Sequence, residues 1–383
     1  MKDEIRFVDL GAQRARLGNQ IERAIARVLE HSQFILGPEV TQFENALADY
    51  CGVRQCVSCA NGTDALAIVL MAINIGPGDA VFVPAFTFAA TAEVVVWLGA
   101  TPIFVDVDET SFDLNPDQLD EAITHARALG LRPQAVIPVD LFGHPADYER
   151  ILAAAERHGL FVLADAAQAI GARYRNQMIG SLAPATATSF FPTKPLGCYG
   201  DGGAVMTDDD DLAEQLRSIR VHGQGDHKYQ NVRIGLNARL DTIQAAILLE
   251  KLAVFDGEIA RRNEIAALYG AQLRDVVTVP RLAPNTSSVW AQYTIRVPAA
   301  IGRDRLSDEL RQAGVPTAIH YPIPLPRQVA YASYPIAPGG TPVSDRLARE
   351  VLSLPMHADL TVAMQTRVIA AIRTCVCGIP TEV

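Results

Sequence analysis

The chain lacks the features that would place it in several large classes of protein. Its 383 residues contain no run of Lys and Arg, and the net charge of −10 would repel a phosphate backbone, so binding to nucleic acid is not expected. The N-terminal residues are charged where an export signal needs an apolar stretch, which predicts a cytoplasmic protein. The most apolar region, residues 86–105, is interrupted by polar residues and by Pro102, so no membrane span is predicted.

Cysteine is scarce, with six residues in the chain. Cys56 and Cys59 form a C-x-x-C motif, and Cys375 and Cys377 form a C-x-C motif near the C-terminus. Such spacings can bind zinc or support redox chemistry, so a zinc or thiol protein is one alternative. The two pairs lie far apart and have no His ligand pattern beside them, which favours reduced thiols in a packed core. No metal site is predicted.

The remaining composition is that of an ordinary globular enzyme, with 49% hydrophobic and 20% charged residues. The length exceeds the roughly 250–300 residues at which one hydrophobic core stops growing, so two domains are expected. We place the boundary near residue 250, which gives a large domain of residues 1–250 and a smaller one of residues 251–383.

Residues 55–207 alternate short apolar runs with helix-like stretches, which predicts an α/β fold with an open, largely parallel sheet covered by helices. The expected strands are residues 80–83, 103–105, 135–139, 161–163 and 204–206, and the expected helices among them include 63–73 and 146–158. Further helical patterns span 237–273, with a break near 255–257, then 303–314 and 360–373. The acidic run Asp208–Asp211 precedes a helix and is interpreted as an N-cap region.

In such a sheet, ligands collect beyond the carboxyl ends of the strands, and several polar residues are expected there. Lys194 lies in the glycine-rich segment SFFPTKPLGCYGDGG (189–203), between two apolar runs. Burial would lower the pKa of its amine, which could then act as a nucleophile and a base. A surface lysine beside a flexible turn is the alternative, and it would be preferred for a lysine standing alone.

Asp165 follows the strand at 161–163 in the segment VLADAAQAIG (162–171). A buried carboxylate needs a charged or hydrogen-bonding partner, and a pyridinium nitrogen supplies both. Gln168 could donate to a phenolic oxygen of the same ring. The alternative is an Asp N-cap followed by a polar helix residue, which is about as consistent with this segment alone.

Two further segments complete a possible cofactor site. ANGTDAL (60–66) precedes an apolar helix, whose N-terminus can bind a phosphate with Gly62 allowing close approach, although a turn and a capped helix would look the same. In PAFTFAAT (84–91) an aromatic residue at the carboxyl edge of the sheet could stack on a planar ring or belong to the core. Together the four segments contain the parts that a pyridoxal-phosphate site requires.

In this order and at these separations, the segments closely resemble the sugar-nucleotide aminotransferases of the DegT/StrS type, within the fold type I pyridoxal-phosphate enzymes. The resemblance covers nearly the whole chain and includes FVDL (7–10), FILGPE (34–39), GLNARLDTIQAA (235–246), HYP (320–322) and LPMH (354–357). It implies a mostly parallel seven-stranded sheet between helices, with an N-terminal helical arm on the large, cofactor-binding domain and an α+β C-terminal domain.

The resemblance implies that Lys194 forms the Schiff base with pyridoxal phosphate, that Asp165 pairs with the ring nitrogen and that Gln168 approaches the phenolic oxygen. Phe88 would stack on the ring. The residues implied to hold the phosphate are Gly62, Thr63 and Ser189, and Asp64 is implied among the cofactor-binding residues. Sister sugar dehydratases carry histidine in place of this lysine, so Lys194 favours transamination.

Members of this family are homodimers with a shared site, which implies that Asn237 reaches the phosphate of the neighbouring subunit and that Arg239 approaches its substrate. The implied reaction transfers the amino group of L-glutamate to a nucleotide-linked keto sugar. The greatest likeness is to enzymes that aminate UDP-2-acetamido-2-deoxy-3-oxo-glucuronate for surface polysaccharides. Arg239, His320 and Tyr321 could then bind the uronate carboxylate, because charged donors suit a planar anion.

Other interpretations of these residues remain. His320 and Tyr321 could be a packed pair at a loop, and Arg239 an exposed helix arginine. The chain departs from many relatives at Pro326, where a polar residue is common. The rival substrate is a dTDP-linked 3-oxo-6-deoxyhexose, which has no carboxylate. A non-catalytic, cofactor-binding sensor is a third alternative, which the intact Lys194 and Asp165 oppose.

Overall fold

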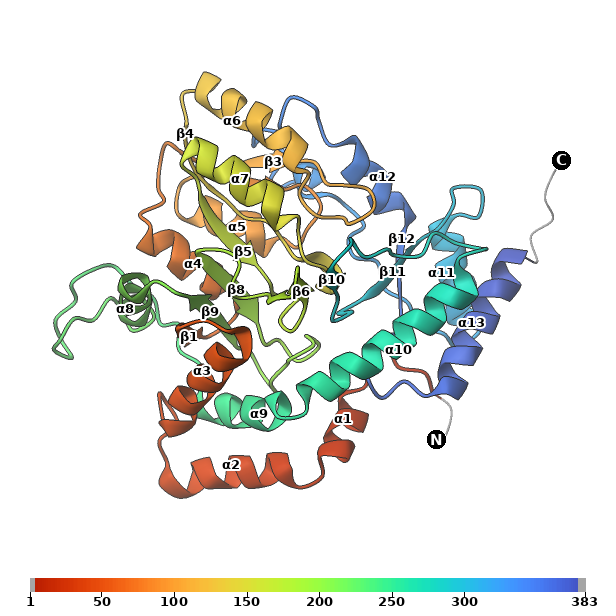
Figure 1. The fold of residues 1–383 in the computed structure, drawn as a ribbon, viewed down its shortest axis with the longest axis horizontal. Coiled ribbons are helices and arrows are strands. Elements are labelled where there is room, and N and C mark those ends of the chain that lie inside the picture. Colours follow the sequence, from red (N-terminus) through yellow and green to blue (C-terminus); the bar gives the residue numbers. More distant parts are fainter. Residues whose placement is uncertain (1–3, 378–383) are drawn as a thin grey trace.

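A computed structural model describes residues 4–377 and consists of a seven-stranded sheet between helices, followed by a smaller C-terminal part (Figure 1). The strand order is β1-β9-β8-β5-β4-β2-β3, with β9 antiparallel to both neighbours and every other pair parallel. The strands of this sheet are β1 (Gln55–Cys59), β2 (Asp79–Pro84), β3 (Thr101–Val105), β4 (Arg132–Val136), β5 (Phe161–Asp165), β8 (Ala185–Ser189) and β9 (Gly203–Thr207).

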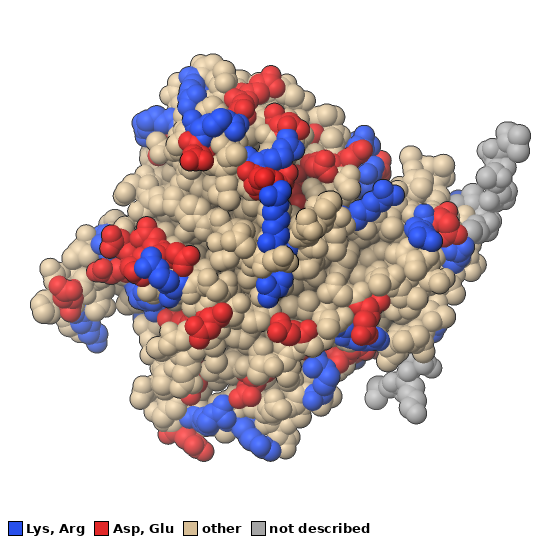
Figure 2. All heavy atoms as spheres, in the orientation of Figure 1, with Lys and Arg blue, Asp and Glu red and all other residues tan. Residues whose placement is uncertain are grey.

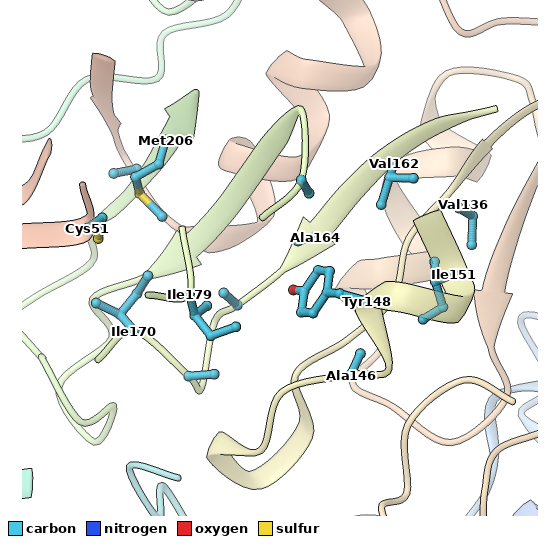
Figure 3. Close-up of a cluster of buried hydrophobic side chains, with 14 of the residues drawn as sticks. Cys51, Val136, Ala146, Tyr148, Ile151, Val162, Ala164, Ile170, Ile179 and Met206 are labelled. Atoms are coloured by element: carbon cyan, nitrogen blue, oxygen red, sulfur yellow. The ribbon is translucent and has the colours of Figure 1, made fainter. Parts of the chain in front are cut away.

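Helices cover both faces of the sheet. Because successive side chains of a strand point to opposite faces, Phe82 of β2 packs on one side while Val81 and Val83 pack on the other. The first face is covered by α3 (Pro38–Cys51), α6 (Leu119–Ala128), α7 (Tyr148–His158) and α9 (Thr242–Leu252), and the second by α4 (Gly62–Ala72), α5 (Ala90–Trp97) and α8 (Asp210–Ile219). Figure 3 shows Tyr148 of α7 among side chains of β4 and β5 on the first face.

The ends of α7 illustrate how the sequence determines where these helices begin and end. The Asp147 side chain accepts a hydrogen bond from the Arg150 N–H at 3.4 Å, which satisfies one of the donors left free at a helix start. Gly159 ends the helix at φ 70°, a left-handed conformation that glycine adopts without a Cβ clash. The buried face between them, including Ile151 and Ala154, then packs on the sheet.

The C-terminal part has its own hydrophobic core. It is built from α10 (Phe255–Leu273), β11 (Tyr293–Arg296), α11 (Arg303–Gln312), β12 (Val351–Leu354) and α13 (Val362–Cys377). Helix α10 connects the two cores, since Phe255 packs with the sheet and Tyr269 with the C-terminal cluster. The division at residue 250 stays a prediction.

Shorter elements surround these two cores. The N-terminal helices α1 (Leu10–Leu17) and α2 (Gln20–His31) lie beside α9, where Leu17 and Ile21 contact Ile247. The remaining elements are β6 (Arg173–Tyr174), β7 (Gln177–Met178), β10 (Thr286–Ser287), α12 (Pro342–Glu350) and the 3₁₀ turns η1 (Pro116–Gln118), η2 (Leu141–Gly143) and η3 (Leu325–Arg327). Pro326, where the chain departs from many relatives, lies buried in η3.

The structure confirms most of the expected elements and corrects two of them. The expected strand at 135–139 ends at Val136, because Pro138 has no N–H to continue the ladder. The helical pattern at 237–273 begins only at Thr242 and breaks at 253–254, since the backbone of Asn237 pairs with Val221 and that of Asp241 with Ile35. Strands β1 and β8 were not among the expected strands.

The acidic run behaves as an N-cap. Asp209 accepts a hydrogen bond from the Leu212 N–H at 3.0 Å, and Asp210 and Asp211 occupy the first turn of α8. On the face shown in Figure 2, acidic side chains gather beside α8, while elsewhere the two signs of charge are interspersed. Within the part of the chain that the structure describes, no helix is long and apolar enough to cross a membrane.

The C-x-x-C motif lies on β1, and this strand separates its two thiols. Cys56 packs in the cluster on one face of the sheet and Cys59 in the cluster on the other, as their odd spacing along a strand requires. One metal ion therefore cannot bind both sulfurs. Among residues 4–377 no group of three His, Cys, Asp or Glu side chains is arranged to hold a metal, and the Cys377 side chain lies outside this description.

Candidate active site

A cavity of about 600 Å³ lies beyond the carboxyl ends of the parallel strands, where β5 and β8 end and α4 begins. Segments distant in sequence meet there: the start of α4, the loop after β2, the ends of β5 and β8, and the loop at 320–321. The predicted site residues that line it are Gly62, Thr63, Asp64, Phe88, Asp165, Gln168, Ser189, Lys194, His320 and Tyr321. The fold thus gathers nearly all of the predicted set.

Asp165 ends β5, and the residue is 6% exposed. One oxygen accepts the Thr91 hydroxyl hydrogen at 2.9 Å, and the other accepts the Ala167 N–H at 3.2 Å. Burial raises the pKa of Asp165, while these two hydrogen bonds and the charge of Lys194 oppose the rise. The carboxylate is fixed in direction and favours a cationic partner.

Lys194 lies in the turn that follows β8 and is half-buried, with its backbone N–H bonded to the Phe191 carbonyl at 2.8 Å. Burial of the amine lowers its pKa, and the carboxylate of Asp165 acts in the opposite direction. The side chain therefore gives up its proton more readily than an exposed lysine. This is the property that a nucleophilic amine needs.

Gln168 presents its amide donors to the cavity. Its oxygen accepts the Phe142 N–H at 2.8 Å, and because a backbone N–H can only donate, the amide nitrogen must face the other way. That nitrogen lies 3.3 Å from the Tyr321 hydroxyl oxygen. The orientation leaves the amide nitrogen of Gln168 as a donor on the cavity side, and its contact with a cofactor stays a prediction.

His320 differs electrostatically from the expectation of a charged donor. Burial, assisted by the charge of Lys194, lowers the pKa of His320 to about 4, so the ring is neutral near pH 7. Its Nδ1 lies 3.0 Å from the Ser353 hydroxyl on β12. His320 can offer a hydrogen bond to an anion, but a positive charge must come from another residue.

The N-terminus of α4 opens onto the cavity. The Asn61 side chain caps only the Asp64 N–H, at 2.8 Å, so the N–H groups at Gly62 and Thr63 have no partner within the helix. A Cβ at position 62 would lie 2.6 Å from the Ser189 Cβ, which shows that glycine here lets the helix approach β8. The Ser189 hydroxyl is thereby placed beside these amides, as an anion site requires.

Aromatic rings border the same cavity. Phe88 is 57% exposed, and its ring centroid lies 6.2 Å from that of Tyr321, tilted by 44°. Trp97 on α5, which belongs to none of the predicted site segments, also lines the cavity and is 58% exposed. A large exposed aromatic face favours contact with a planar ligand.

Two predicted residues do not line this cavity. Asn237 and Arg239 lie in the segment between α8 and α9, and the implied role for both is in a neighbouring subunit. Their contribution stays a prediction. Conversely, Thr91 binds Asp165, a role that was not predicted although Thr91 ends the segment PAFTFAAT. A threonine on a buried helix face gives no signal of such a contact until β5 lies beside it.

The fold and this cavity define the class of protein: an α/β enzyme whose cavity at the carboxyl edge of the sheet is lined by a lysine and a buried carboxylate. Residues 15–373 match the DegT/DnrJ/EryC1/StrS aminotransferase family, and the chain belongs to this family. It is 49% identical to the UDP-2-acetamido-2-deoxy-3-oxo-D-glucuronate aminotransferase of Pseudomonas aeruginosa, over 96% of this chain and 99% of that one. It is 42% identical to a dTDP-3-amino-3,4,6-trideoxy-alpha-D-glucose transaminase of Streptomyces venezuelae, over 96% and 95%.

Solved structures agree with the fold. A DegT/DnrJ/EryC1/StrS aminotransferase from Brucella abortus superposes with a TM-score of 0.95 at 53% identity, covering 97% of this chain and 99% of that one. NtdA from Bacillus subtilis, solved with bound cofactor PMP, superposes with a TM-score of 0.89 at 29% identity, covering 98% and 86%. The chain therefore has the architecture of the aminotransferases in this family.

Proposed function

We propose that this chain uses pyridoxal phosphate to transfer an amino group from L-glutamate to the 3-keto group of UDP-2-acetamido-2-deoxy-3-oxo-glucuronate, a step in surface polysaccharide synthesis. The observation that carries the proposal is that the amine of Lys194 and the carboxylate of Asp165 line one cavity. Family membership supports the reaction class, and the 49% identical relative from P. aeruginosa supports the substrate.

The donors around the cavity fit this cofactor. The N–H groups at Gly62 and Thr63, with the Ser189 hydroxyl, suit a phosphate, and Asp64 in the first turn of α4 lines the same cavity. The buried carboxylate of Asp165 suits the protonated ring nitrogen, and the amide donors of Gln168 suit the phenolic oxygen. The exposed face of Phe88 suits the ring itself.

When bound, pyridoxal phosphate supplies an electrophilic carbon for the amine and a cationic ring that accepts negative charge. Lys194 would take and return protons at Nζ, because burial lowers the pKa of this amine. Asp165 would hold the protonated ring nitrogen in place, because hydrogen bonds from the Thr91 hydroxyl and the Ala167 N–H fix both oxygens of its carboxylate. The partly enclosed cavity would limit the access of water to these groups.

The substrate carboxylate would be bound by residues that differ in charge. Neutral His320 and the hydroxyl of Tyr321 offer hydrogen bonds, so Arg239 of a neighbouring subunit would have to supply the positive charge. Replacing Arg239 by Met should raise KM for the keto-uronate and leave KM for a substrate without a carboxylate unchanged. An equal rise for both substrates would remove this assignment.

A homodimer is part of the proposal. The segment between α8 and α9 projects from the body of the protein (Figure 1) and carries Tyr229 and Ile234, which are 88% and 84% exposed. Apolar side chains this exposed are typical of an interface. Such an interface would place Asn237 and Arg239, at the end of the same segment, near the cavity of the partner.

A spectroscopic titration tests the cofactor and the half-reaction. We expect the purified protein to show a visible absorption band with pyridoxal phosphate, to lose it on addition of L-glutamate, and to regain it on addition of the keto sugar. A protein without such a band, or with a band that glutamate does not change, would rule out the reaction.

The second candidate substrate is a dTDP-linked 3-oxo-6-deoxyhexose, which the 42% identical transaminase of S. venezuelae favours. Initial rates with both keto sugars, measured at equal concentration with glutamate as donor, separate the two. We expect faster turnover of the UDP-linked keto-uronate. Equal or faster turnover of the deoxyhexose would overturn the choice of substrate and leave the reaction class intact.

A further inference from the structure

A second buried lysine contacts the loop that carries Lys194. Lys251 lies in the last turn of α9 and is 2% exposed. Its ammonium donates a hydrogen bond to the Gly197 carbonyl at 2.5 Å and lies 4.2 Å from the centroid of the Tyr199 ring. Both contacts are made to the segment immediately after Lys194.

This ammonium is buried without an opposite charge of its own. In the part of the chain that the structure describes, no carboxylate forms an ion pair with Lys251, and the nearby Glu258 is already bound by Gln13 and Arg16. Burial lowers the pKa of Lys251 to about 8, so the group is mostly charged near neutral pH. An apolar side chain such as Met would fill this space without the cost of burying a charge.

The loop has a second attachment to the same helix. The Gln244 side-chain oxygen accepts the Tyr199 N–H at 2.9 Å. Gln244 and Lys251 are seven residues apart on α9, so they lie on one face of the helix. Helix α9 therefore forms hydrogen bonds with the loop at Gly197 and at Tyr199, on either side of Cys198.

The loop is also held by side-chain packing and by its own backbone turns. Leu196 and Cys198 are buried in the cluster on the first face of the sheet, and Tyr199 packs against the cluster that contains Leu17 and Ile21. The Cys198 N–H donates to the Phe190 carbonyl at 2.8 Å, and the Lys194 N–H donates to the Phe191 carbonyl at 2.8 Å. These bonds close the loop on itself but do not tie it to the helical layer. Among the described residues, the hydrogen bonds that join the loop to the helical layer come from Gln244 and Lys251 of α9.

We propose that Lys251 is a positioning residue for Lys194, and that its ammonium holds Gly197 and Tyr199 so that the Lys194 amine is directed at Asp165. The proposal rests on the proposed function, in which the Lys194 amine reacts. A reacting group that is misplaced by a fraction of an ångström loses much of its rate, so the effect of Lys251 should appear in kcat.

The test compares two substitutions that each remove a buried donor to a backbone carbonyl. Lys251→Met breaks the contact with the loop. Gln365→Met breaks a matched contact elsewhere, since buried Gln365 donates to the Ile265 carbonyl at 2.6 Å in the C-terminal core. The main readout is the pH midpoint for labelling of the Lys194 amine in cofactor-free protein, followed by peptide mass spectrometry. The chain has only four lysines, which makes the assignment simple.

In Lys251→Met the midpoint for Lys194 should rise toward that of an exposed lysine, by roughly half a pH unit or more, because the loop no longer keeps the amine buried. In the cofactor-loaded enzyme kcat should fall by roughly tenfold or more with little change in the KM for the amino donor. Gln365→Met should lower the melting temperature and leave the midpoint unchanged. A Lys251→Met protein with the wild-type midpoint and kcat would overturn the proposal.

A second variant separates position from charge. Tyr199→Leu keeps the Lys251 charge and removes the ring against which it packs. A rise in the pH midpoint for labelling of Lys194 in this variant would therefore result from a changed position of the loop and not from the loss of a charge. It also provides the test if Lys251→Met does not fold, and an unchanged midpoint would then overturn the proposal. The labelling needs no cofactor, so a failure of the proposed reaction in the wild type remains distinguishable from a failure of this proposal.

Discussion

At the scale of single residues, burial decides which charges the site carries. It lowers the pKa of Lys194 and His320 and raises that of Asp165, so each group is shifted toward its neutral form. Asp165 and Lys194 partly offset each other's shift because their charges are opposite. The charge of Lys194 lowers the pKa of His320 further instead of opposing the effect of burial, so its ring is neutral at pH 7. The amine of Lys194 therefore lies in a cavity that is also lined by carboxylates, Asp165 among them, rather than in a cluster of cations.

Replacing Asp165 by Asn should reduce kcat by roughly 10²-fold or more, because a neutral amide does not keep a ring nitrogen protonated. The melting temperature should change little, because Asn keeps an oxygen for the Thr91 hydroxyl, and the removal of a buried charge offsets the loss of the hydrogen bond from the Ala167 N–H, which an amide NH2 cannot accept. Steady-state rates and thermal melting check both expectations. A variant that keeps wild-type kcat would contradict the role of Asp165.

A second buried acid gives a pH-dependent stability. Asp140 accepts hydrogen bonds from the Ala146 N–H and the Tyr148 hydroxyl, each at 2.8 Å, and burial raises the pKa of Asp140 to about 7. The folded state thus keeps a proton that the unfolded chain releases near pH 4. The stability linked to this proton is complete below about pH 4 and is lost as the pH rises through 7.

Asp140→Asn carries no such proton, so the wild type should lose stability relative to this variant between pH 4 and 8. The expected change is on the order of 4 kcal/mol, since the shift is about three pKa units and each unit corresponds to about 1.4 kcal/mol. Melting temperatures of both proteins across this range test the prediction. Parallel curves would show that Asp140 does not titrate there.

At the scale of elements, the approach of α4 to β8 depends on Gly62. Gly62→Ala would bring a Cβ to 2.6 Å from that of Ser189, so we expect a loss of roughly 1–3 kcal/mol and weaker cofactor binding. Gly257→Ala on α10 is the control, because a Cβ there meets nothing within 4 Å and should stabilise the helix by roughly 0.5–1 kcal/mol. Chemical denaturation and cofactor titration measure both. Equal stability of the two variants would contradict the close packing.

Strand β1 likewise determines what its cysteines can do. Burial raises the pKa of Cys56 and Cys59, which lie on opposite faces of the sheet. We expect neither thiol to react with a thiol reagent in the native protein, and both to react after denaturation. Dialysis against a chelator should leave aminotransfer unchanged. Loss of activity that zinc restores would contradict this prediction.

At the scale of the whole molecule, the proposed shared site can be tested by mixing inactive subunits. Lys194→Ala lacks the reactive amine and Arg239→Ala lacks the residue expected to enter the neighbouring site. A mixed dimer should contain one site with both residues intact, so mixing the two variants should restore up to about a quarter of wild-type activity. Activity that does not exceed the sum of the separate variants would place both residues in the same subunit's site.

The sequence could predict the α/β class, most strands and the cavity-lining set, because these follow from local patterns. Alternating apolar runs indicate strands, a glycine before an apolar helix indicates an anion site, and polar residues after strands indicate the carboxyl edge of the sheet. The start of α9 could not be predicted in this way. It is set by the pairing of Asn237 and Asp241 with residues far away in the chain.

The sequence by itself determined which chemical groups the protein has and, through the order of its motifs, the family to which it belongs. Only the tertiary structure decided the protonation states of these groups and the contacts that hold them. Examples are the neutral ring of His320, the hydrogen bond from the Thr91 hydroxyl to Asp165, and the hydrogen bond from Lys251 to Gly197 in the loop that carries Lys194. These depend on burial and on contacts between distant segments. Neither exists until the chain has folded, because both are properties of neighbours in space.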